Sequence, residues 1–507
     1  MQPKKITSAL ISVYNKTHLE RIVQVLHNQG VTIYSTGGTK DFIQTLGVPV
    51  IAVEEVTGYP SILGGRVKTL HPKIFGGILY RSSETQDIAQ IEEYDIPAID
   101  LVIVDLYPFE QTLASGASHE EIIEKIDIGG VALIRAAAKN YLDTVVIASQ
   151  EQYGFLLEKL EQNQGIISYA DRRLLAAYAF DVTSHYDTAI FHYFNQSQAV
   201  PSFKQSIRKA QVLRYGENPH QRGIFYGDLS QMLEQLHGKE LSYNNLVDIE
   251  AAIALTEEFT EKAFVIIKHT NACGVGIAST TVEAYLKAFA CDTVSAFGGV
   301  LCTNQTIDLP TAQELNKLFF EVLIAPDYET KALELLKEKK NRILVKQKQP
   351  LPQGIQFKSL LNGVIAQDKD NKTETREDLK VVTHRKPSEE EVEALLFANK
   401  IVKHTKSNAI VLAKKDIFLA SGVGQTSRID ALKQALEKAK NFGFALQGAV
   451  MASDAFFPFP DCVEIAHQAG ITAIIQPGGS IKDQASIDYC NAHHLAMVFT
   501  GIRHFKH

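Results

Sequence analysis

The sequence contains no tryptophan and only five cysteines, which lie far apart with no Cys-x-x-Cys pair among its 507 residues. The odd number and the wide spacing argue against a disulfide framework and against a structural zinc site, and they favour a reducing compartment. Long apolar runs are also lacking, since none approaches the ~18–20 residues of a membrane span. The first residues do not resemble a cleavable signal peptide. We therefore expect a cytoplasmic protein without a membrane partner.

An excess of positive charge is missing as well. The chain has 51 Lys and Arg against 58 Asp and Glu, a net charge of −7, which gives no general attraction for nucleic acid. The basic stretch 337–348 contains a glutamate and no aromatic residue, so a solvated helix face explains it best. With 45% hydrophobic and 21% charged residues, the chain is too apolar to be disordered.

Short apolar runs alternate with amphipathic helical stretches along the chain. Strands are expected at residues 9–13, 31–34, 101–106, 144–148, 263–267, 409–413 and 472–475. Helices are expected at residues 17–28, 41–46, 131–140 and 429–440. This alternation predicts an α/β protein with largely parallel sheets, in which ligands bind beyond the carboxyl ends of the strands. A polar stretch at 195–205 predicts a boundary between two blocks, and the highly charged residues 368–378 predict an exposed loop or hairpin tip.

The first block contains a glycine-rich turn, Ser35-Thr36-Gly37-Gly38-Thr39-Lys40, between an expected strand and an expected helix. Backbone N–H groups and the positive end of the helix dipole at such a turn suit an anion, and the threonine hydroxyls can add donors. It is not a Walker loop, and a tight turn that ends in a helix cap explains it equally well.

Cations accompany glycines again at Gly64-Gly65-Arg66-Val67-Lys68-Thr69. If this segment is extended, Arg66 and Lys68 share one face and suit a phosphate or a developing oxyanion. A solvated surface loop is the alternative, although the segment contains no balancing acid.

Acidic and phenolic groups follow in the same block. Asp105 and Tyr107 come at or after the end of the strand 101–106, and Asp127 precedes a helix that carries Lys139. Asp127 could simply start that helix, and Lys139 could simply complement its dipole. Together, however, these segments would serve a phosphorylated substrate that undergoes a proton transfer.

The motifs ISVYNK, STGGT, LGGRVKTLHP, DLYPF and DIGGVALIRAAAKN occur in this order. They resemble the inosine monophosphate (IMP) cyclohydrolase domain of a bifunctional purine-synthesis enzyme family, whose fold is similar to methylglyoxal synthase. The resemblance implies that the nucleotide phosphate is held by Lys16, Thr36, Gly37, Gly38 and Thr39. It implies that the closing ring is surrounded by Arg66, Lys68, Thr69, Tyr107, Asp127 and Lys139.

The resemblance also implies roles for three of these residues. Tyr107 and Lys139 would stabilise the tetrahedral oxygen, and Asp127 would help to take the amide proton. Phe75 stands where members of the family often carry histidine, so no proton-shuttling role is expected there.

In the second block, Lys268 and His269 follow the expected strand 263–267 and precede what reads as a glycine turn, residues 270–276. A cation and a titratable base at a strand's carboxyl end suit a ligand site, although a lone histidine is usually structural. The loop 213–221 presents Arg214 and Tyr215, for which a structural turn is the simple alternative.

Two more segments of this block leave their interpretation open. Residues 422–428 form a Gly-x-Gly turn before a helix, but without a third glycine or a later acid they are weak evidence for a dinucleotide. Phe456, Phe457 and Phe459 lie between prolines and fit either the core or a wall for a flat heterocycle.

These segments are similar, in order, to the aminoimidazole-carboxamide ribonucleotide (AICAR) formyltransferase domain of the same family, so the resemblance spans essentially the whole chain. It implies a methylglyoxal-synthase-like domain with a parallel sheet at residues 1–197 and a pair of cytidine-deaminase-like subdomains at residues 198–507. No Pro-Cys-x-x-Cys element is present, so deaminase zinc chemistry is not expected. The resemblance further implies a homodimer with the formyltransferase sites at its interface.

For formyl transfer the resemblance implies that His269 accepts the proton of the attacking amine, Lys268 stabilises the developing charge and Asn408 holds the formyl oxygen. The cosubstrate would be 10-formyltetrahydrofolate, with no catalytic metal; whether a monovalent cation binds is left open. The residues implied to position the substrates are Arg214, Tyr215, Asp327, Arg428, Phe456, Asp461, Arg503 and His507, with Arg428 on the folate side.

The leading prediction is therefore an enzyme that formylates AICAR and then closes the ring to IMP. The alternatives are a formyltransferase whose other site has decayed, a nucleotide-sensing module on the same folds, and an oxidoreductase with nicotinamide bound at residues 422–428. Intact Lys268, His269, Asp127 and Lys139 argue against the first two of these alternatives.

Overall fold

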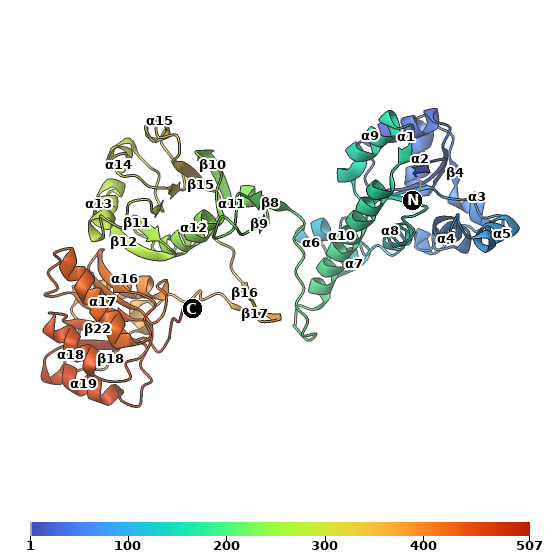
Figure 1. Cartoon of the computed structure of the whole chain (residues 1–507). Helices are drawn as coiled ribbons and strands as arrows, with labels where there is room; N and C mark the ends of the chain where they lie inside the picture. Colours follow the sequence, from blue (N-terminus) through green and yellow to red (C-terminus); the bar gives the residue numbers. More distant parts are fainter. Residues whose placement is uncertain (1–2) are drawn as a thin grey trace. The chain divides into compact units, whose positions relative to one another are not determined.

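The computed structural model describes residues 3–507 and divides the chain into two compact units (Figure 1). Unit 1 ends at Arg208, and unit 2 begins at Lys209. Residues 195–208, which follow the long helix α10 (Tyr169–Phe194), therefore belong to unit 1. No helix within residues 3–507 is both long enough and apolar enough to cross a membrane.

Unit 1 is built on a five-stranded sheet with the strand order β4-β3-β2-β5-β6, in which every neighbouring pair is parallel. The strands are β2 (Ser8–Ser12), β3 (Thr32–Ser35), β4 (Ile51–Ala52), β5 (Leu101–Val104) and β6 (Val145–Ile147). The four residues of β5 are all buried, as expected for a strand covered on both faces. Because the strands are parallel, their carboxyl ends share one edge of the sheet.

Helices cover both faces of this sheet. In α1, the buried residues Leu19, Ile22, Val23 and Leu26 recur at the spacing of one helix face. Helices α1 and α9 pack together, and α8 packs on α10. The helices of unit 1 are α1 (Leu19–Asn28), α2 (Gly37–Thr45), α3 (Val53–Thr57), α4 (Pro72–Leu79), α5 (Thr85–Glu93), α6 (Phe109–Ala114), α7 (His119–Ile123), α8 (Gly129–Lys139), α9 (Tyr153–Gln162) and α10. The short strands β1 (Lys4–Lys5) and β7 (Ile166–Ile167) pair antiparallel at the side.

Unit 2 contains a twelve-stranded sheet made of two halves with the same topology. Its order is β10-β15-β14-β13-β11-β12-β20-β19-β21-β22-β23-β18. Each half has a central antiparallel hairpin, then three strands parallel to one another, then an antiparallel edge strand. The strands of the first half are β10 (Leu233–His237), β11 (Ala263–Lys268), β12 (Asn271–Ile277), β13 (Val300–Thr303), β14 (Val322–Ala325) and β15 (Ile343–Gln347).

The second half repeats this arrangement with the strands β18 (Lys380–Val381), β19 (Ile410–Lys414), β20 (Ile417–Gly422), β21 (Val450–Ser453), β22 (Ala473–Gln476) and β23 (Ala496–Phe499). The halves meet where Gly276 of β12 pairs with Ile417 of β20. The helices of unit 2 are α11 (Leu229–Met232), α12 (Tyr243–Thr256), α13 (Thr281–Cys291), α14 (Leu309–Leu315), α15 (Thr330–Lys337), α16 (Glu389–Lys403), α17 (Arg428–Asn441), α18 (Asp461–Gln468) and α19 (Asp483–Ala492). Two hairpins, β8 (Ala210–Leu213) with β9 (Gly223–Tyr226) and β16 (Ile355–Leu360) with β17 (Gly363–Asp368), lie outside the sheet.

All seven expected strands are confirmed, but the expectation of largely parallel sheets holds only in unit 1. The glycine turn expected at residues 270–276 is wrong, because this segment is mostly the strand β12. Its glycines serve packing instead. A Cβ atom on Gly274 would lie 2.0 Å from the carbonyl oxygen of Ala288, and one on Gly276 would lie 2.5 Å from that of Ala284. Glycine thus lets α13 pack directly against the strand.

Three local expectations in the chain also need correction. Helix α2 begins at Gly37 rather than at Asp41, so the glycine turn is the first turn of the helix itself. Residues 63–69 form a 3₁₀ turn followed by a further turn and are not extended. Residues 369–378 do form a connecting segment, but Glu374 within it is buried, so the segment is not simply an exposed loop.

Candidate active sites

The first candidate site lies at the carboxyl edge of the unit 1 sheet, where β3 leads into α2. Thr36 is the N-cap residue, and Gly37 has φ +43°, a left-handed conformation that glycine adopts without strain. A Cβ atom on Gly37 would lie 3.3 Å from Nζ of Lys68, and one on Gly38 would lie 4.0 Å from Nζ of Lys16. Two ammonium groups therefore stand beside the amino-terminal turn of a helix, an arrangement that suits a phosphate.

The threonine hydroxyls of this turn are used inside the fold. Oγ1 of Thr39 accepts from the Val13 N–H at 3.1 Å and donates to the Val13 carbonyl at 2.9 Å, while Oγ1 of Thr36 lies 3.0 Å from Oγ of Ser12. Both threonines are buried. They fix the end of β2 against α2, so in this arrangement the two lysines and the helix dipole are the features that attract an anion.

Asp105, after β5, holds the loop that carries Lys16. Its carboxylate accepts hydrogen bonds from the N–H groups of Tyr14 and of Asn15, the latter at 3.0 Å, and Nζ of Lys16 donates to the Tyr14 carbonyl at 2.9 Å. Burial raises the pKa of Asp105. The sequence placed Asp105 at the strand end but did not indicate this anchoring role.

Asp127 lies beside Tyr107 and the start of α8. Its carboxylate accepts a hydrogen bond from the Gly130 N–H at 2.6 Å, and it also accepts from the backbone of Tyr107. Burial raises the pKa of Asp127, and burial together with the charge of Asp127 raises the pKa of Tyr107. Thr69 is close by, because a Cβ atom on Gly129 would lie 3.0 Å from its Oγ1. The carboxylate of Asp127 and the phenol of Tyr107 can therefore accept and donate a proton.

Lys125 is a residue of this region that sequence reasoning missed. Its Nζ lies 5.4 Å from the ring centroid of Tyr14 and 5.8 Å from that of Tyr107, and the two rings pack edge to face with centroids 5.6 Å apart. A cation over an aromatic face is attracted by the ring quadrupole. Only the fold brings Lys125 to the two tyrosines, so no local pattern could have revealed it.

The fold does not join Arg66 and Lys139 to the group formed by Asp127, Tyr107 and Thr69. Arg66 forms an exposed ion pair with Glu124 instead of sharing a face with Lys68. Lys139 occupies the last turn of α8, whereas Asp127 precedes the first turn. At 1.5 Å per residue the two ends of this helix are about 15 Å apart.

The second candidate site centres on the turn between β11 and β12. His269 and Thr270 have φ +49° and +64°, so the turn is tight and left-handed. Within the first half of unit 2, a hydrogen bond fixes this turn: the Thr270 N–H donates to Oδ1 of Asp248 on α12 at 2.8 Å. Nδ2 of Asn271 donates to the His269 carbonyl at 2.9 Å, and Oδ1 of Asn271 accepts from the Lys406 N–H at 3.0 Å. Asn271, which the sequence did not single out, thus joins the His269 turn to the second half.

Lys268 is the last residue of β11, and its Nζ donates to the Phe297 carbonyl at 2.7 Å. The exposed rings of Phe297 and Phe319 pack beside this ammonium group with their centroids 5.0 Å apart. The charge of Lys268 is therefore held in place next to an aromatic surface.

Asn408 precedes β19 and is fixed by a buried arginine. Nη2 of Arg428 donates to Oδ1 of Asn408 at 2.9 Å, and Nδ2 of Asn408 donates to the Gln425 carbonyl at 2.9 Å. The same guanidinium pairs with Asp454. Arg428 is 7% exposed and Asp454 1% exposed, so this arginine contacts protein groups and orients Asn408.

The carboxyl-terminal residues run alongside Asn408. The Ser407 N–H donates to the Lys506 carbonyl at 2.9 Å, and the Lys506 N–H donates to Oγ of Ser407 at 2.9 Å. The side chains alternate as in a strand, with Arg503 and His507 exposed and His504 buried. The tail therefore presents two of the predicted substrate-binding residues.

Other predicted residues lie on surfaces around unit 2. Nη2 of Arg214 donates to Oη of Tyr215 at 2.7 Å, and their loop contacts α12 through Nδ2 of Asn244, which donates to the Glu217 carbonyl at 3.2 Å. Phe456 is exposed and Asp461 begins α18. The sequence left open whether the three phenylalanines belong to the core or form a wall for a heterocycle. Phe457 is fully buried, whereas Phe456 and Phe459 are exposed.

Asp327 and His269 lie at opposite ends of the strands of the large sheet. It follows β14, which runs parallel to β13 and therefore antiparallel to β11. At ~3.3 Å per residue the pairing register separates the two residues by about 20 Å along the strands. Asp327 forms an exposed ion pair with Lys346 at 3.0 Å.

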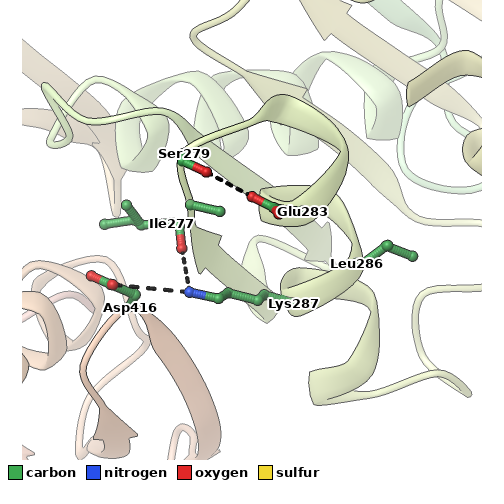
Figure 2. Close-up of a pocket in the computed structure, with 7 residues that line it drawn as sticks. Ile277, Ser279, Glu283, Leu286, Lys287 and Asp416 are labelled. Carbon is green, nitrogen blue, oxygen red and sulfur yellow. Dashed lines mark hydrogen bonds and ion pairs between the residues drawn. The ribbon is translucent and has the colours of Figure 1, made fainter. Parts of the chain in front are cut away.

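A surface pocket of about 570 Å³ also lies at that end of the strands, because its lining residue Ile277 pairs with Ala263 at the start of β11. Figure 2 draws the residues that line this pocket. Nζ of Lys287 donates to the Ile277 carbonyl at 2.7 Å and lies 3.9 Å from Asp416, while Ser279 donates to Glu283 at 2.8 Å. None of the predicted site residues lines it. Within residues 3–507 no group of three or more His, Cys, Asp or Glu side chains could hold a metal ion.

Comparisons with known proteins identify two family models along the chain. Residues 18–132 match the family described as MGS-like domain, and residues 137–438 match the family described as AICARFT/IMPCHase bienzyme. Three relatives carry the name "Bifunctional purine biosynthesis protein PurH". That of Bacteroides thetaiotaomicron is 62% identical over 506 residues, with both chains covered completely. Those of Acetivibrio thermocellus and Aquifex aeolicus are 48% and 47% identical and cover 99% and 98% of this chain, each along the whole relative.

Proposed function

Because the chain belongs to the AICARFT/IMPCHase bienzyme family, it is a bifunctional enzyme of purine biosynthesis with AICAR formyltransferase and IMP cyclohydrolase activities, and we propose that unit 2 formylates AICAR and unit 1 closes the ring. The observation that carries this division is the junction at Asn271, which joins the His269 turn to the segment that leads to Asn408 within unit 2. The phosphate cradle at α2 and the proton-carrying group at Asp127 both lie in unit 1.

For formyl transfer, the amine of AICAR attacks the formyl carbon of 10-formyltetrahydrofolate, a C–N bond forms, and the bond from that carbon to N10 of the folate breaks. His269 takes the proton from the attacking amine, since an imidazole exchanges protons near neutral pH, and returns it to N10 of the departing tetrahydrofolate. Lys268 and Asn408 stabilise the oxygen of the tetrahedral intermediate. The contacts of Lys268 with Phe297 and of Asn408 with Arg428 support this assignment, because they fix both donors before substrate binds.

Arg428 takes part in this proposal as a positioning residue instead of a folate ligand, because its guanidinium is buried against Asp454 and Asn408. The remaining predicted residues of unit 2 that contact solvent would bind the nucleotide: Arg214, Tyr215, Phe456, Asp461, Arg503 and His507. The repeated strand order of the two halves supports the inference that each is a cytidine-deaminase-like subdomain.

For ring closure, the carboxamide nitrogen of the formylated nucleotide attacks its own formyl carbon, and water leaves. The reaction is intramolecular, so the enzyme chiefly has to hold the substrate folded. Lys16, Lys68 and the start of α2 would hold the phosphate, Asp127 would take the amide proton, and Tyr107 would donate to the developing oxygen. Burial raises the pKa of Asp127, which makes its carboxylate a better base than an ordinary one.

We assign Lys139 and Asp327 to sites in a second copy of the chain. Each lies far from the group that it would join within one chain, at the far end of α8 or at the far edge of the large sheet. In a homodimer with sites at the interface, the partner copy could supply them. Lys139 would then stabilise the oxygen in cyclisation, and Asp327 would bind the nucleotide in formyl transfer.

The proposal includes the cytoplasm as the working compartment, which the five buried free thiols support. The proposal also allows a monovalent cation to bind. Oδ2 of Asp454, buried and without a hydrogen-bond partner, is an oxygen that would suit such an ion in a structural role near the Asn408 segment.

The decisive experiment is a chromatographic product assay of the purified protein with AICAR, with and without 10-formyltetrahydrofolate. We expect IMP to form only when the folate is present. Accumulation of the formylated nucleotide would contradict the role given to unit 1. Tight binding of AICAR without any consumption, in a folded protein, would replace the proposal with the nucleotide-sensing module.

A matched variant assigns the two steps to the two units. His269→Asn should consume no AICAR, yet it should convert added formyl-AICAR to IMP at the unmodified rate, because His269 belongs to unit 2 alone. Loss of both steps in this variant would contradict the division of labour.

A further inference from the structure

His504, the fourth residue from the end of the sequence, lies between two carboxylates. Its Nδ1 lies 2.6 Å from Oδ2 of Asp370, and its Nε2 lies 3.0 Å from Oε1 of Glu374. The histidine is 2% exposed and Glu374 5% exposed. Both ring nitrogens therefore face negative oxygen atoms in an enclosed position.

Between two ionised carboxylates, this geometry favours a protonated ring. A neutral imidazole has one N–H and one lone pair, so it could satisfy only one carboxylate and would direct its lone pair at the other. The imidazolium donates to both. Burial by itself lowers the pKa of His504, but the hydrogen bonds and charges of Asp370 and Glu374 outweigh it and raise the pKa to about 9.

The segment that carries the two carboxylates is itself fixed to the helix α16. Oε2 of Glu374 accepts from Nδ2 of Asn399 at 2.8 Å, and Nζ of Lys403 donates to the carbonyl of Lys372 at 2.8 Å. Asn399 and Lys403 lie one helical turn apart on α16. The segment 370–374, which connects the two halves of the large sheet, is thus a firm base for the tail.

The tail held in this way adjoins the formyltransferase site. His504 N–H donates to the Asp454 carbonyl at 3.0 Å, and Lys506 pairs with Ser407 next to Asn408. Because side chains alternate along the tail, burying His504 directs its neighbours Arg503 and Phe505 outward, and His507 with them.

We propose that His504, clamped between Asp370 and Glu374, is a positioning residue that locks the tail so that Arg503 and His507 face the nucleotide. The inference rests on the proposed role of unit 2 in formyl transfer. It extends that role, since it assigns a function to three residues that lie outside the predicted site. The linker between the two halves becomes part of the site's support.

The test compares His504→Gln with the control His384→Gln, which changes an exposed histidine of the same unit. We expect hydrogen exchange of residues 500–507 to rise in His504→Gln only. The KM for AICAR should rise about 10-fold or more while cyclisation of added formyl-AICAR stays unchanged, because the misplaced tail weakens nucleotide binding. Unchanged exchange and an unchanged KM in His504→Gln would overturn the inference.

The pH dependence separates a protonated clamp from simple packing. The groups that face His504 are Asp370 and Glu374, with Lys403 near Asp370. Because the folded pKa of His504 is raised to about 9, the clamp is complete below the ordinary histidine pKa and is lost as pH rises through about 9. In the unmodified protein, exchange of the tail should increase through that range.

Glu374→Gln provides a second variant that keeps the shape of the side chain and removes one charge. The pH at which tail exchange increases should shift downward in this variant, whereas a merely structural role would leave that pH unchanged. The tail exchange needs no substrate, so it tests the clamp even if the protein makes no formylated product. Absence of that product from the unmodified protein would instead contradict the proposed function.

Discussion

Asp127 shows at the scale of a single residue how burial can prepare a base. Burial raises its pKa, while the backbone N–H groups of Gly130 and Tyr107 hold the carboxylate in one orientation. Gly130 is required there, because a Cβ atom would lie 2.7 Å from Oδ2 of Asp127. The raised pKa means that the charged carboxylate of Asp127 lowers the stability of the folded protein once the pH exceeds the ordinary carboxyl value.

Asp127→Asn should therefore separate activity from stability. We expect the rate of formyl-AICAR cyclisation to fall by about 10²–10⁴-fold, the usual contribution of a positioned base. At neutral pH the melting temperature should stay the same or rise, because the variant no longer buries a charge. Cyclisation by stopped assay and melting by calorimetry give the two readouts.

Asp95→Asn, which changes a fully exposed carboxylate of the same unit, is the matched control. It should leave both readouts unchanged. Full cyclisation activity in Asp127→Asn would remove Asp127 from the mechanism.

At the scale of elements, the functional groups come from the ends of strands and from segments between them. The α2 turn, the β11–β12 turn and the carboxyl-terminal tail each present side chains from short pieces of backbone. Glycine at positions 274 and 276 lets α13 pack on β12, and Asn271 at the start of the same strand accepts a hydrogen bond from the Lys406 N–H. The tail has no secondary structure of its own, and it is held by Ser407, Asp454 and the two carboxylates around His504.

Deletion of residues 503–507 tests the tail as an element. We expect formyl transfer to fall by at least about 100-fold, because the deletion removes Arg503 and His507 and withdraws the backbone partner of Ser407. Cyclisation should be unchanged, since the tail belongs to unit 2. Both rates can be measured on one preparation, so the cyclisation rate serves as the control for folding. Normal formyl transfer in the truncated protein would show that the tail is dispensable.

At the scale of the whole molecule, two predicted site residues, Lys139 and Asp327, lie far from the other residues of their sites within one chain. Asp327 lies about 20 Å along the strands from His269, at the edge of the large sheet that carries the pocket at Lys287 and Asp416. The antiparallel hairpin at the centre of each half causes this separation, because it reverses the direction of β11 relative to β13 and β14. In the proposed homodimer, a site that uses both Asp327 and His269 would combine two chains.

Mixed dimers test that arrangement. Asp327→Ala and His269→Ala should each abolish most formyl transfer when expressed alone. When the two variants are mixed and reassociated, heterodimers carry one site with both changes and one site with neither. Random pairing should restore about a quarter of the unmodified activity. The carboxylate of Asp327 forms an exposed ion pair with Lys346 and accepts a local hydrogen bond from the Tyr328 N–H, so its removal should leave the fold intact.

Mixing His269→Ala with Lys268→Ala is the control, because these neighbours must belong to the same chain and no pairing restores an intact site. Failure of the first mixture to recover activity would place Asp327 outside the formyltransferase site.

The sequence by itself determined the α/β class, the positions of the strands and the groups that carry charge. Runs such as residues 263–267 are recognisable because a buried strand must be apolar, and the glycine turn at residues 35–40 is recognisable because an anion site needs free backbone donors. The order of the motifs also identified the family, and the comparisons confirmed it. These features are local, so local patterns reveal them.

Only the tertiary structure decided which groups meet. It turned residues 271–277 into a strand, buried Arg428 against Asp454, and enclosed His504 between Asp370 and Glu374, more than a hundred residues away in sequence. A charged stretch such as residues 368–378 predicts exposure because burying a carboxylate is costly unless a partner is present. That partner comes from the far end of the chain, and no pattern along the sequence records the contact.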